Sequence, residues 1–339
     1  MRARVAPAPA RAPRSRATRA RCRGVARCAA GETRRALEAA REGMTIALAL
    51  RDEAAVVVEK ADASAATTGD VAAQTAVLMR LRTLGSMDDF VGEETVEGLD
   101  AAAAAAAAAR AAGGTAAEAA RETRAPSERY WCCDPLDGTK AYMSKDGEKQ
   151  FVLGLALVDA RGTATTAVMM APNWPGGGVE MYAARGEGCF VRKFGSSEPF
   201  RRTTCARATT LSEARVVISA HENFESLPLG KAMGAAPAAV KRLCCGSLCK
   251  YVSCALGESS VFIQHPSGDG FVNSWDHAAG ILCCEEAGCA VSDLFGGAIT
   301  LLGRDGDRRR FAPGGGGIIC ATREIHADVV RAFAVGSKA

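Results

Sequence analysis

The stretch WCCDPLDGTKAY (131–142) places two aspartates, Asp134 and Asp137, three positions apart around a proline, directly after an apolar run. Like charges that converge at the end of a strand destabilise a fold unless a cation holds them together. Carboxylate oxygens are hard ligands, which suit magnesium better than zinc or copper. The stretch therefore predicts a strand that ends at a divalent-metal site.

Two further acidic residues are candidates for the same cluster. Glu93 ends the short strand predicted in DDFVGEE (88–94), and Asp276 stands at a predicted helix start in SWDHAAG (274–280). Four carboxylates around one point would repel one another severely, which implies two or three divalent ions. Paired ions about 3.5–4 Å apart clamp the attacking and leaving oxygens of a phosphoryl displacement. The cluster therefore indicates phosphatase chemistry.

The neighbouring residues offer the other groups that hydrolysis requires. If a short helix begins at Gly138 and Thr139, its free N–H groups can receive a phosphate. Asp70, in TTGD (67–70), is predicted to be the N-cap of the next helix. Paired with the Thr139 hydroxyl, Asp70 is the candidate for accepting the proton of an attacking water, the alternative being that it only caps the helix.

Apolar periodicity predicts layered sheets and helices, with an α+β first half (31–175) and an α/β second half (176–339). The first half holds most of the acidic cluster, and the second half contributes its last member. The predicted helices cover 33–59, 71–81, 228–239, 247–257 and 276–288. The predicted strands cover 88–94, 130–134, 151–159, 165–172, 214–220, 259–264 and 318–322, with a hairpin at 183–192.

Two segments are expected to lie outside this fold. Residues 1–30 hold nine arginines and no acidic residue, which is typical of an organellar transit peptide; chloroplast is favoured over mitochondrion, and a basic disordered tail is the alternative. Residues 101–124 begin with nine consecutive alanines and are predicted to form a surface insertion.

Without residues 1–30, 33 basic and 38 acidic residues remain, a net charge of −5 that disfavours a nucleic-acid partner.

Composition excludes further classes of protein. Apolar runs such as 151–158 are far shorter than the roughly 20 residues of a membrane-spanning helix. The fourteen cysteines include three adjacent pairs and lack paired C-x-x-C spacings, so neither a disulfide framework nor a structural zinc site is predicted. The thiols are expected to be reduced and buried, with a redox-regulated pair as the alternative. The sequence does not set the oligomeric state, although a monomer is favoured.

The segments GEE (92–94), DPLDGT (134–139) and WDHAAG (275–280) together resemble the magnesium-dependent, lithium-sensitive phosphatase superfamily of inositol monophosphatase. TTGDVAAQTA (67–76) and CGSLCKYVSCALG (245–257) resemble more closely the 3'(2'),5'-bisphosphate nucleotidases, including plant organellar members. The resemblance covers roughly residues 35–335. It implies an α-β-α-β-α sandwich and hydrolysis of the 3'-phosphate of adenosine 3',5'-bisphosphate, or of its sulfated analogue, by metal-activated water.

The resemblance also implies a role for each candidate residue. Asp70 and Thr139 would activate water, and Gly138 and Thr139 would hold the scissile phosphate. The second half would form the nucleotide pocket with His221, Ser247 and Lys250. The implied magnesium ligands are Glu93, Asp134, the Leu136 carbonyl, Asp137 and Asp276.

One departure from the pattern keeps alternatives open. Gln264 stands at a strand end where these nucleotidases commonly have an arginine, so the nucleotide pocket lacks one positive charge. An inositol mono- or polyphosphate phosphatase is the alternative enzyme, and a regulator that binds metal and nucleotide with little turnover is the alternative of another class. Arg308 to Arg310 are expected in an exposed loop.

Overall fold

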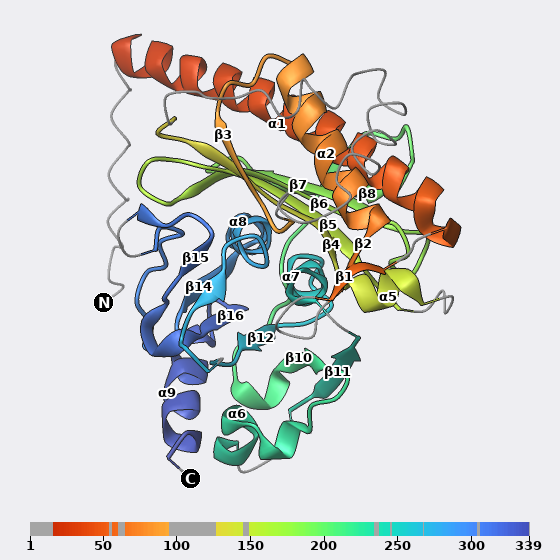
Figure 1. Cartoon of the computed structure of the whole chain (residues 1–339). Coiled ribbons are helices and arrows are strands. Elements are labelled where there is room, and N and C mark those ends of the chain that lie inside the picture. The colour runs from red at the N-terminus through yellow and green to blue at the C-terminus, as the bar shows by residue number, and fades with distance from the viewer. Residues whose placement is uncertain are drawn as a thin grey trace.

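The computed structural model describes residues 16–53, 56–59, 65–94, 127–144, 149–233, 237–244, 246–266, 268–303 and 306–338, and the side chains of its first helix from residue 30 onward. These residues stack in five layers, which alternate helices and sheets (Figure 1). The α-β-α-β-α arrangement and the α/β class predicted from the sequence are thereby confirmed.

The first sheet has seven strands in the order β3-β4-β5-β6-β7-β8-β9. Its pairs are antiparallel except β3 with β4, which run parallel. The sheet continues past the predicted boundary at 175, because β7 to β9 extend it, and the division into two domains stays a prediction. The strands are β3 (Asp89–Gly92), β4 (Tyr130–Asp137), β5 (Val152–Val158), β6 (Ala164–Ala171), β7 (Val179–Ala184), β8 (Gly188–Lys193) and β9 (Arg201–Arg202).

The second sheet has five strands in the order β11-β10-β12-β16-β14. Because β10 runs parallel to β11 and β12, the carboxyl ends of these three strands meet at one edge. A short pair, β13 (Val272–Asn273) with β15 (Arg310–Phe311), joins distant segments. The strands of the second sheet are β10 (Arg215–Ser219), β11 (Ala239–Leu243), β12 (Val261–Gln264), β14 (Cys289–Asp293) and β16 (Ile318–Thr322).

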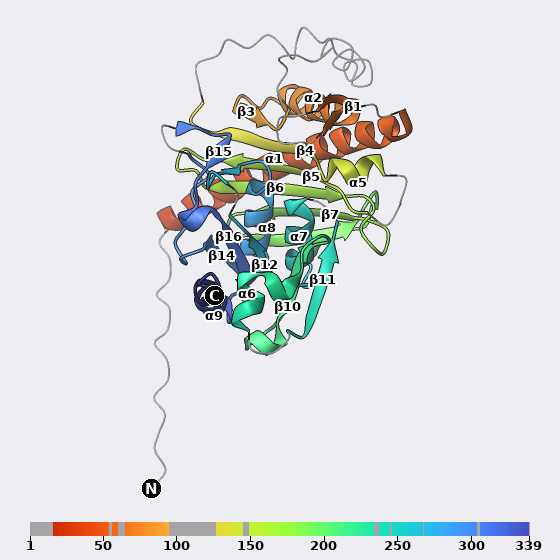
Figure 2. The same ribbon diagram turned by 60° about the horizontal axis from the view of Figure 1, so that its bottom comes forward.

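Helices separate and cover the two sheets. The outer face of the first sheet packs against α1 (Arg16–Leu50) and α2 (Thr68–Thr83), and the middle layer consists of α7 (Ser247–Ala255) and α8 (Ala278–Ala287). Below the second sheet, α6 (Pro228–Ala232) lies beside α9 (His326–Gly336), where the chain ends (Figures 1 and 2). The remaining described helices are short: η1 (Arg51–Glu53), α5 (Thr139–Met143), η2 (Leu211–Glu213), η3 (Phe224–Ser226) and η5 (Gly314–Gly316).

The helix predicted over 33–59 is wrong at both ends. It begins at Arg16, inside the segment predicted as a transit peptide, and it ends at Leu50. Residues Val56–Glu59 instead form strand β1, which pairs with β2 (Ala65–Thr67). Three consecutive valines favour an extended backbone, because branching at Cβ restricts χ1 in a helix. Residues 1–15 and the alanine-rich insertion at 101–124 lie outside the described residues.

The helix predicted over 228–239 is also wrong, because α6 ends at Ala232 and β11 begins at Ala239. Pro237 explains the change, since proline lacks an N–H and disfavours helical geometry in the residue before it. The helices predicted at 71–81, 247–257 and 276–288 are present. None of the described helices has the length and apolarity required to cross a bilayer.

Candidate active site

The carboxylates of Asp134 and Asp137 reach one point because strand β4 is bulged between them. In a regular strand, residues three apart point to opposite faces of the sheet. Here Asp134 pairs with Gly154 and Asp137 pairs with Val152, so two residues of β4 stand opposite one residue of β5. Pro135 lies in this bulge, where a residue without an N–H is tolerated. The bulge turns both aspartates to the same side.

Glu93 is brought to the same place by the parallel pairing of β3 with β4. Gly92, the last residue of β3, pairs with Cys133, and the Glu93 N–H donates to the Cys133 carbonyl at 3.1 Å. Glu93, the first residue after β3, therefore lies beside Asp134 in the neighbouring strand β4. The negative charge of Glu93 contributes to the raised pKa of Asp134.

Asp276 joins the cluster from the second half of the chain. It lies in the turn between β13 and α8, where the Asn273 side chain donates to its carboxylate at 3.1 Å. One oxygen atom from each of Asp134, Asp137 and Asp276 lies within 4.8 Å of the other two. The structure thus brings together three predicted carboxylates, and the charge of Glu93 acts on the pKa of all three.

The electrostatics of the cluster favour a cation. Burial, together with the charges of Glu93, Asp137 and Asp276, raises the pKa of Asp134 well above its usual range. Burial and the charge of Asp137 also raise the pKa of Asp276 to about 8. Oδ1 of Asp134 accepts the Leu136 N–H at 3.1 Å, whereas Oδ2 is buried without a hydrogen-bond partner among the described residues. A buried carboxylate oxygen that lacks a partner is costly, so it fits a divalent cation.

The chemistry of the donors also fits magnesium. The grouped side chains offer only carboxylate oxygens, and the predicted Leu136 carbonyl lies in the same bulged segment, where it accepts the Thr139 hydroxyl at 3.2 Å. Hard oxygen donors of this kind suit magnesium and calcium. Glu93, Asp134, Asp137 and Asp276, with the Leu136 carbonyl, are therefore the residues of this chain that would hold such ions.

Asp137 links the acidic cluster to helix α7. Its carboxylate accepts the N–H groups of Ser247 at 3.2 Å and Leu248 at 2.5 Å, at the positive end of the helix dipole. Burial raises the pKa of Asp137 to about 6, although the charge of Lys250 and these hydrogen bonds oppose the rise. Gly246 permits the close approach, because its φ is +81° and a Cβ there would lie 2.4 Å from the carboxylate. The Asp137 carboxylate and the start of α7 are therefore held together as one unit.

Asp70 and Thr139 lie in contact beside the cluster. The Thr139 hydroxyl can donate to Oδ1 of Asp70 at 3.2 Å, an alternative to its bond with the Leu136 carbonyl at the same distance. Burial raises the pKa of Asp70 to about 6, against the opposing hydrogen bonds from Thr67. A carboxylate with that pKa is ionised at neutral pH, so it can accept a proton through the threonine.

The N-cap of helix α2 is Thr67 and not Asp70, which corrects the sequence prediction. Thr67 has an extended backbone, and its hydroxyl oxygen accepts the N–H groups of Gly69 at 3.2 Å and Asp70 at 3.3 Å. Asp70 is the third residue of the helix, and its Oδ2 accepts the Thr67 N–H at 2.8 Å. This reciprocal capping box holds the Asp70 carboxylate in a fixed orientation toward Thr139.

The residues predicted for the nucleotide lie near the carboxyl edge of β10, β11 and β12. The Ser247 hydroxyl donates to the Gln264 side chain at 3.3 Å. Lys250 is buried, and its ammonium group donates to the Gly246 carbonyl at 2.7 Å. His221 is exposed two residues after β10, and among the described residues no hydrogen bond joins it to the other three. The structure therefore joins Ser247 to Gln264, and among the described residues His221 is not hydrogen-bonded to them.

Arg309 is a supporting residue that the sequence interpretation missed by placing it in an exposed loop. Its guanidinium donates to the carbonyls of Gly92 and Glu93, each at 3.1 Å, and lies 4.7 Å from the ring centre of Trp275. It therefore connects the end of β3 to the segment that carries Asp276. Three consecutive arginines gave no signal of this role, because only the pairing of β13 with β15 places Arg309 there.

Replacing Arg309 with methionine (Arg309→Met) is expected to raise the magnesium concentration for half-maximal activity by about 10- to 100-fold, because groups that orient metal ligands contribute on that scale. Turnover at saturating magnesium should change little. Arg309→Lys keeps the charge but loses the paired donors, so it should restore only part of the affinity. Arg310→Met is the matched control, since Arg310 pairs with the exposed Asp269. Equal magnesium dependence in the Arg309 and Arg310 variants would refute the assignment.

In the folded protein the pKa of Asp276 is about 8, whereas the ordinary value is 3.8. The metal-free protein should therefore lose stability as the pH rises between these two values. Across this range the folded state binds more protons than the unfolded state, so the free energy of unfolding falls with increasing pH. Thermal unfolding in a chelator at several pH values measures the slope, and Asp276→Asn should flatten it. Magnesium should raise Tm more at pH 8 than at pH 5. A chelated wild type and Asp276→Asn variant with the same slope would contradict this account.

Comparison with known proteins agrees with this geometry. Residues 27–335 match the model of the inositol monophosphatase family. A Shigella flexneri protein named 3'(2'),5'-bisphosphate nucleotidase CysQ is 30% identical, over 74% of this chain and 84% of its own length. An Arabidopsis thaliana protein, provisionally named a mitochondrial 3'(2'),5'-bisphosphate nucleotidase, is 32% identical over 61% of this chain, and the match spans only 57% of that protein.

A solved structure gives the same result for the fold. The IMPase of Thermotoga maritima superposes with a TM-score of 0.64 at 19% identity, over 89% of this chain and 96% of that one. At this identity the likeness concerns the fold alone. The family match covers most of the sequence and includes every residue of the acidic cluster. The chain belongs to the inositol monophosphatase family of hydrolases.

Proposed function

We propose that this chain removes the 3'-phosphate of adenosine 3',5'-bisphosphate to give AMP and phosphate, with magnesium as its cofactor. The observation that carries the proposal is the acidic cluster, in which one oxygen from each of three carboxylates lies within 4.8 Å of the other two and one buried oxygen has no hydrogen-bond partner among the described residues. The names of the Shigella and Arabidopsis relatives support a bisphosphorylated nucleotide as substrate.

Separate residues of the chain would bind the metal ions and the scissile phosphate. Glu93, Asp134, Asp137, Asp276 and the Leu136 carbonyl would hold two or three magnesium ions. Bound magnesium would offset the charge of the carboxylates and polarise the phosphoryl oxygens. Gly138, whose φ is +96°, and Thr139 present the start of α5 beside the cluster, where backbone N–H groups can contact the scissile phosphate. This arrangement suits direct attack by water without a covalent intermediate.

In this proposal, Thr139 and Asp70 accept the proton of the attacking water. A water that donates to the Thr139 oxygen can lose its proton as the threonine passes its own proton to Oδ1 of Asp70, 3.2 Å away. The capping box with Thr67 keeps that carboxylate aimed at Thr139. One hydroxyl and one carboxylate thereby act as the general base, while the phosphate would be held beside the carboxylate cluster.

The second half of the chain supplies the nucleotide contacts in this proposal. Ser247 and Lys250 lie in the first turn of helix α7, which is joined to the acidic cluster through Asp137. A cation and neutral donors at that place suit the 5'-phosphate and ribose. Gln264 contributes an amide instead of a positive charge, and His221 would have to approach the ligand from the exposed edge. We therefore expect the nucleotide to be held less tightly than the scissile phosphate.

The test is phosphate release from four substrates, with and without magnesium: adenosine 3',5'-bisphosphate, its 5'-phosphosulfate analogue, inositol 1-phosphate and inositol 1,4-bisphosphate. The proposal expects magnesium-dependent release that is fastest from the nucleotides. Faster release from an inositol phosphate would favour the alternative enzyme. Binding of nucleotide with no release from any substrate would favour a regulator.

We also propose that the arginine-rich residues 1–30 direct the protein to an organelle. The mitochondrial name of the Arabidopsis relative supports the mitochondrion over the chloroplast that the composition favours. Fusing residues 1–30 to a fluorescent protein distinguishes the two by microscopy. A diffuse cytosolic signal would contradict an organellar address.

A further inference from the structure

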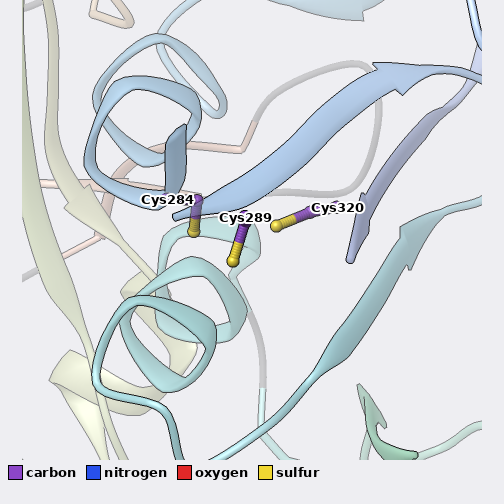
Figure 3. Close-up of side chains that lie close together, drawn as sticks. All are labelled: Cys284, Cys289 and Cys320. Carbon is purple, nitrogen blue, oxygen red and sulfur yellow. The ribbon is translucent and has the colours of Figure 1, made fainter. Parts of the chain in front are cut away.

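Three buried cysteines converge between helix α8 and strands β14 and β16 (Figure 3). Cys284 lies in the last turn of α8, Cys289 begins β14, and Cys320 lies in β16. Their sulfur atoms all lie within 4.8 Å of one another. In the sheet, Cys289 pairs with Thr322 and Val291 pairs with Cys320, which places the two cysteines on the same face. The convergence therefore follows from strand register.

Cys205 is a fourth thiol at this place. Its side chain is hydrogen-bonded to Cys289, and its N–H donates to the Ala287 carbonyl at 2.8 Å. A Cβ on Gly288, in the turn between α8 and β14, would lie 3.3 Å from the Cys205 sulfur. Cys205 is partly exposed, unlike the three convergent cysteines. It can therefore close a four-thiol group and give access to it from solvent.

None of the four cysteines is in a disulfide bond, although the Cys284 thiol donates to the Tyr251 carbonyl at 3.4 Å. Ten described cysteines, including these four, carry free thiols, whereas Cys244 is disulfide-bonded, contrary to the expectation that all thiols are reduced. The thiols of Cys205, Cys284 and Cys320 hydrogen-bond with Cys289. Arg323 adds positive charge, since its guanidinium donates to the Cys289 carbonyl at 3.4 Å.

The dimensions suit a thiophilic cation. Zinc is bound by four thiolates in a tetrahedron with Zn–S distances of about 2.3 Å, which places sulfur atoms about 3.8 Å apart. The sulfur atoms of Cys284, Cys289 and Cys320, which lie up to 4.8 Å apart, would therefore have to contract by about 1 Å, and Cys205, which lies outside that group of three, would have to move closer. Soft thiolate ligands select zinc over magnesium, so this site would not compete for the ions of the carboxylate cluster.

We propose that Cys205, Cys284, Cys289 and Cys320 form a closed structural zinc site, separate from the carboxylate cluster. Binding releases the four thiol protons to solvent and leaves a net charge of −2 at the site, which the Arg323 guanidinium partly offsets. The proposed ligands come from a loop, a helix and two strands. The sequence therefore contains no pair of C-x-x-C spacings that would predict the site. The site ties the α8–β14 turn to the second sheet.

Cadmium titration of the chelator-treated, fully reduced protein tests the proposal. Cadmium bound by thiolates gives an ultraviolet charge-transfer band, which cadmium bound by carboxylates does not. The expected result is a band that saturates at one equivalent of cadmium. Added zinc should compete for the same site and weaken the band, to a degree set by the affinity of zinc relative to that of cadmium. Zinc should also raise Tm. A reduced, folded wild type without the band at one equivalent would overturn the site and leave the thiols as ordinary core residues.

Substitutions identify the ligands. Cys289→Ala and Cys320→Ala should abolish the band, and Cys205→Ala should weaken cadmium binding at least tenfold. Cys189→Ala is the matched control, because Cys189 is equally buried and contacts Cys283 outside the group. Asp134→Asn should keep the band, which separates this result from failure of the proposed activity. A band that survives in both Cys289→Ala and Cys320→Ala would refute the assignment even if zinc binds elsewhere.

Discussion

Replacing Asp134 with asparagine (Asp134→Asn) is expected to lower kcat for phosphate release by about 10³-fold or more, equivalent to about 4 kcal/mol of transition-state stabilisation. Asp134 lies at the centre of the cluster, where Glu93, Asp137 and Asp276 all raise its pKa. The substitution would change the carboxylate whose Oδ2 has no hydrogen-bond partner among the described residues. Phosphate release at saturating magnesium measures the effect.

The same variant separates a lost ligand from a damaged fold. In a chelator, Asp134→Asn should unfold at the same temperature as wild type or higher, because it replaces a buried carboxyl group whose ionised form is opposed by burial and by its neighbours with a neutral amide. In magnesium it should gain less stability than wild type. Asp293→Asn is the matched control, since Asp293 caps a turn outside the cluster through the N–H groups of Phe295 and Gly297. Full activity in Asp134→Asn would remove the basis of the metal assignment.

Replacing Asp70 with asparagine (Asp70→Asn) is expected to lower kcat by about 10²- to 10⁴-fold with little change in KM, because general-base catalysis contributes on that scale. Asparagine keeps an oxygen for the capping box but cannot accept a proton. Thr139→Val should cause a similar loss, because it removes the hydroxyl that lies 3.2 Å from the carboxylate. Steady-state kinetics on adenosine 3',5'-bisphosphate provides the measurement.

The double variant tests whether the two residues act together. If Thr139 passes the proton to Asp70, the combined loss should be close to that of either single variant. Thr75→Val is the matched control, since the Thr75 hydroxyl bonds the Val71 carbonyl within the same helix. Losses that multiply in the double variant would show that Asp70 and Thr139 work independently.

The sequence predicted the acidic cluster because its chemistry is carried by residue type. Four carboxylates at element ends, with an adjacent Gly-Thr step, are rarely grouped without a cation. It could not predict how Asp134 and Asp137 reach the same face, since their spacing alone places them on opposite sides of a strand. The bulge at Pro135 depends on pairing with β5, which is a tertiary property.

The parts that the sequence missed depend on contacts between distant segments. Arg309 is one of three adjacent arginines, and its role appears only when β15 pairs with β13 and the Arg309 guanidinium lies over the Trp275 ring. Cys284, Cys289 and Cys320 have no metal-binding spacing, because their convergence follows from the register of β14 on β16. The helix predictions at 33–59 and 228–239 fail for local reasons. The valines of β1 favour an extended strand, and Pro237 disfavours a continued helix.

A crystal structure of the protein with manganese, a magnesium substitute that is visible by anomalous scattering, tests the central claim most directly. We expect two or three anomalous peaks, ringed by Glu93, Asp134, Asp137 and Asp276, with the 3'-phosphate of a bound nucleotide next to Thr139. An empty cluster at saturating manganese, or Glu93 and Asp276 turned away from the aspartate pair, would contradict the account.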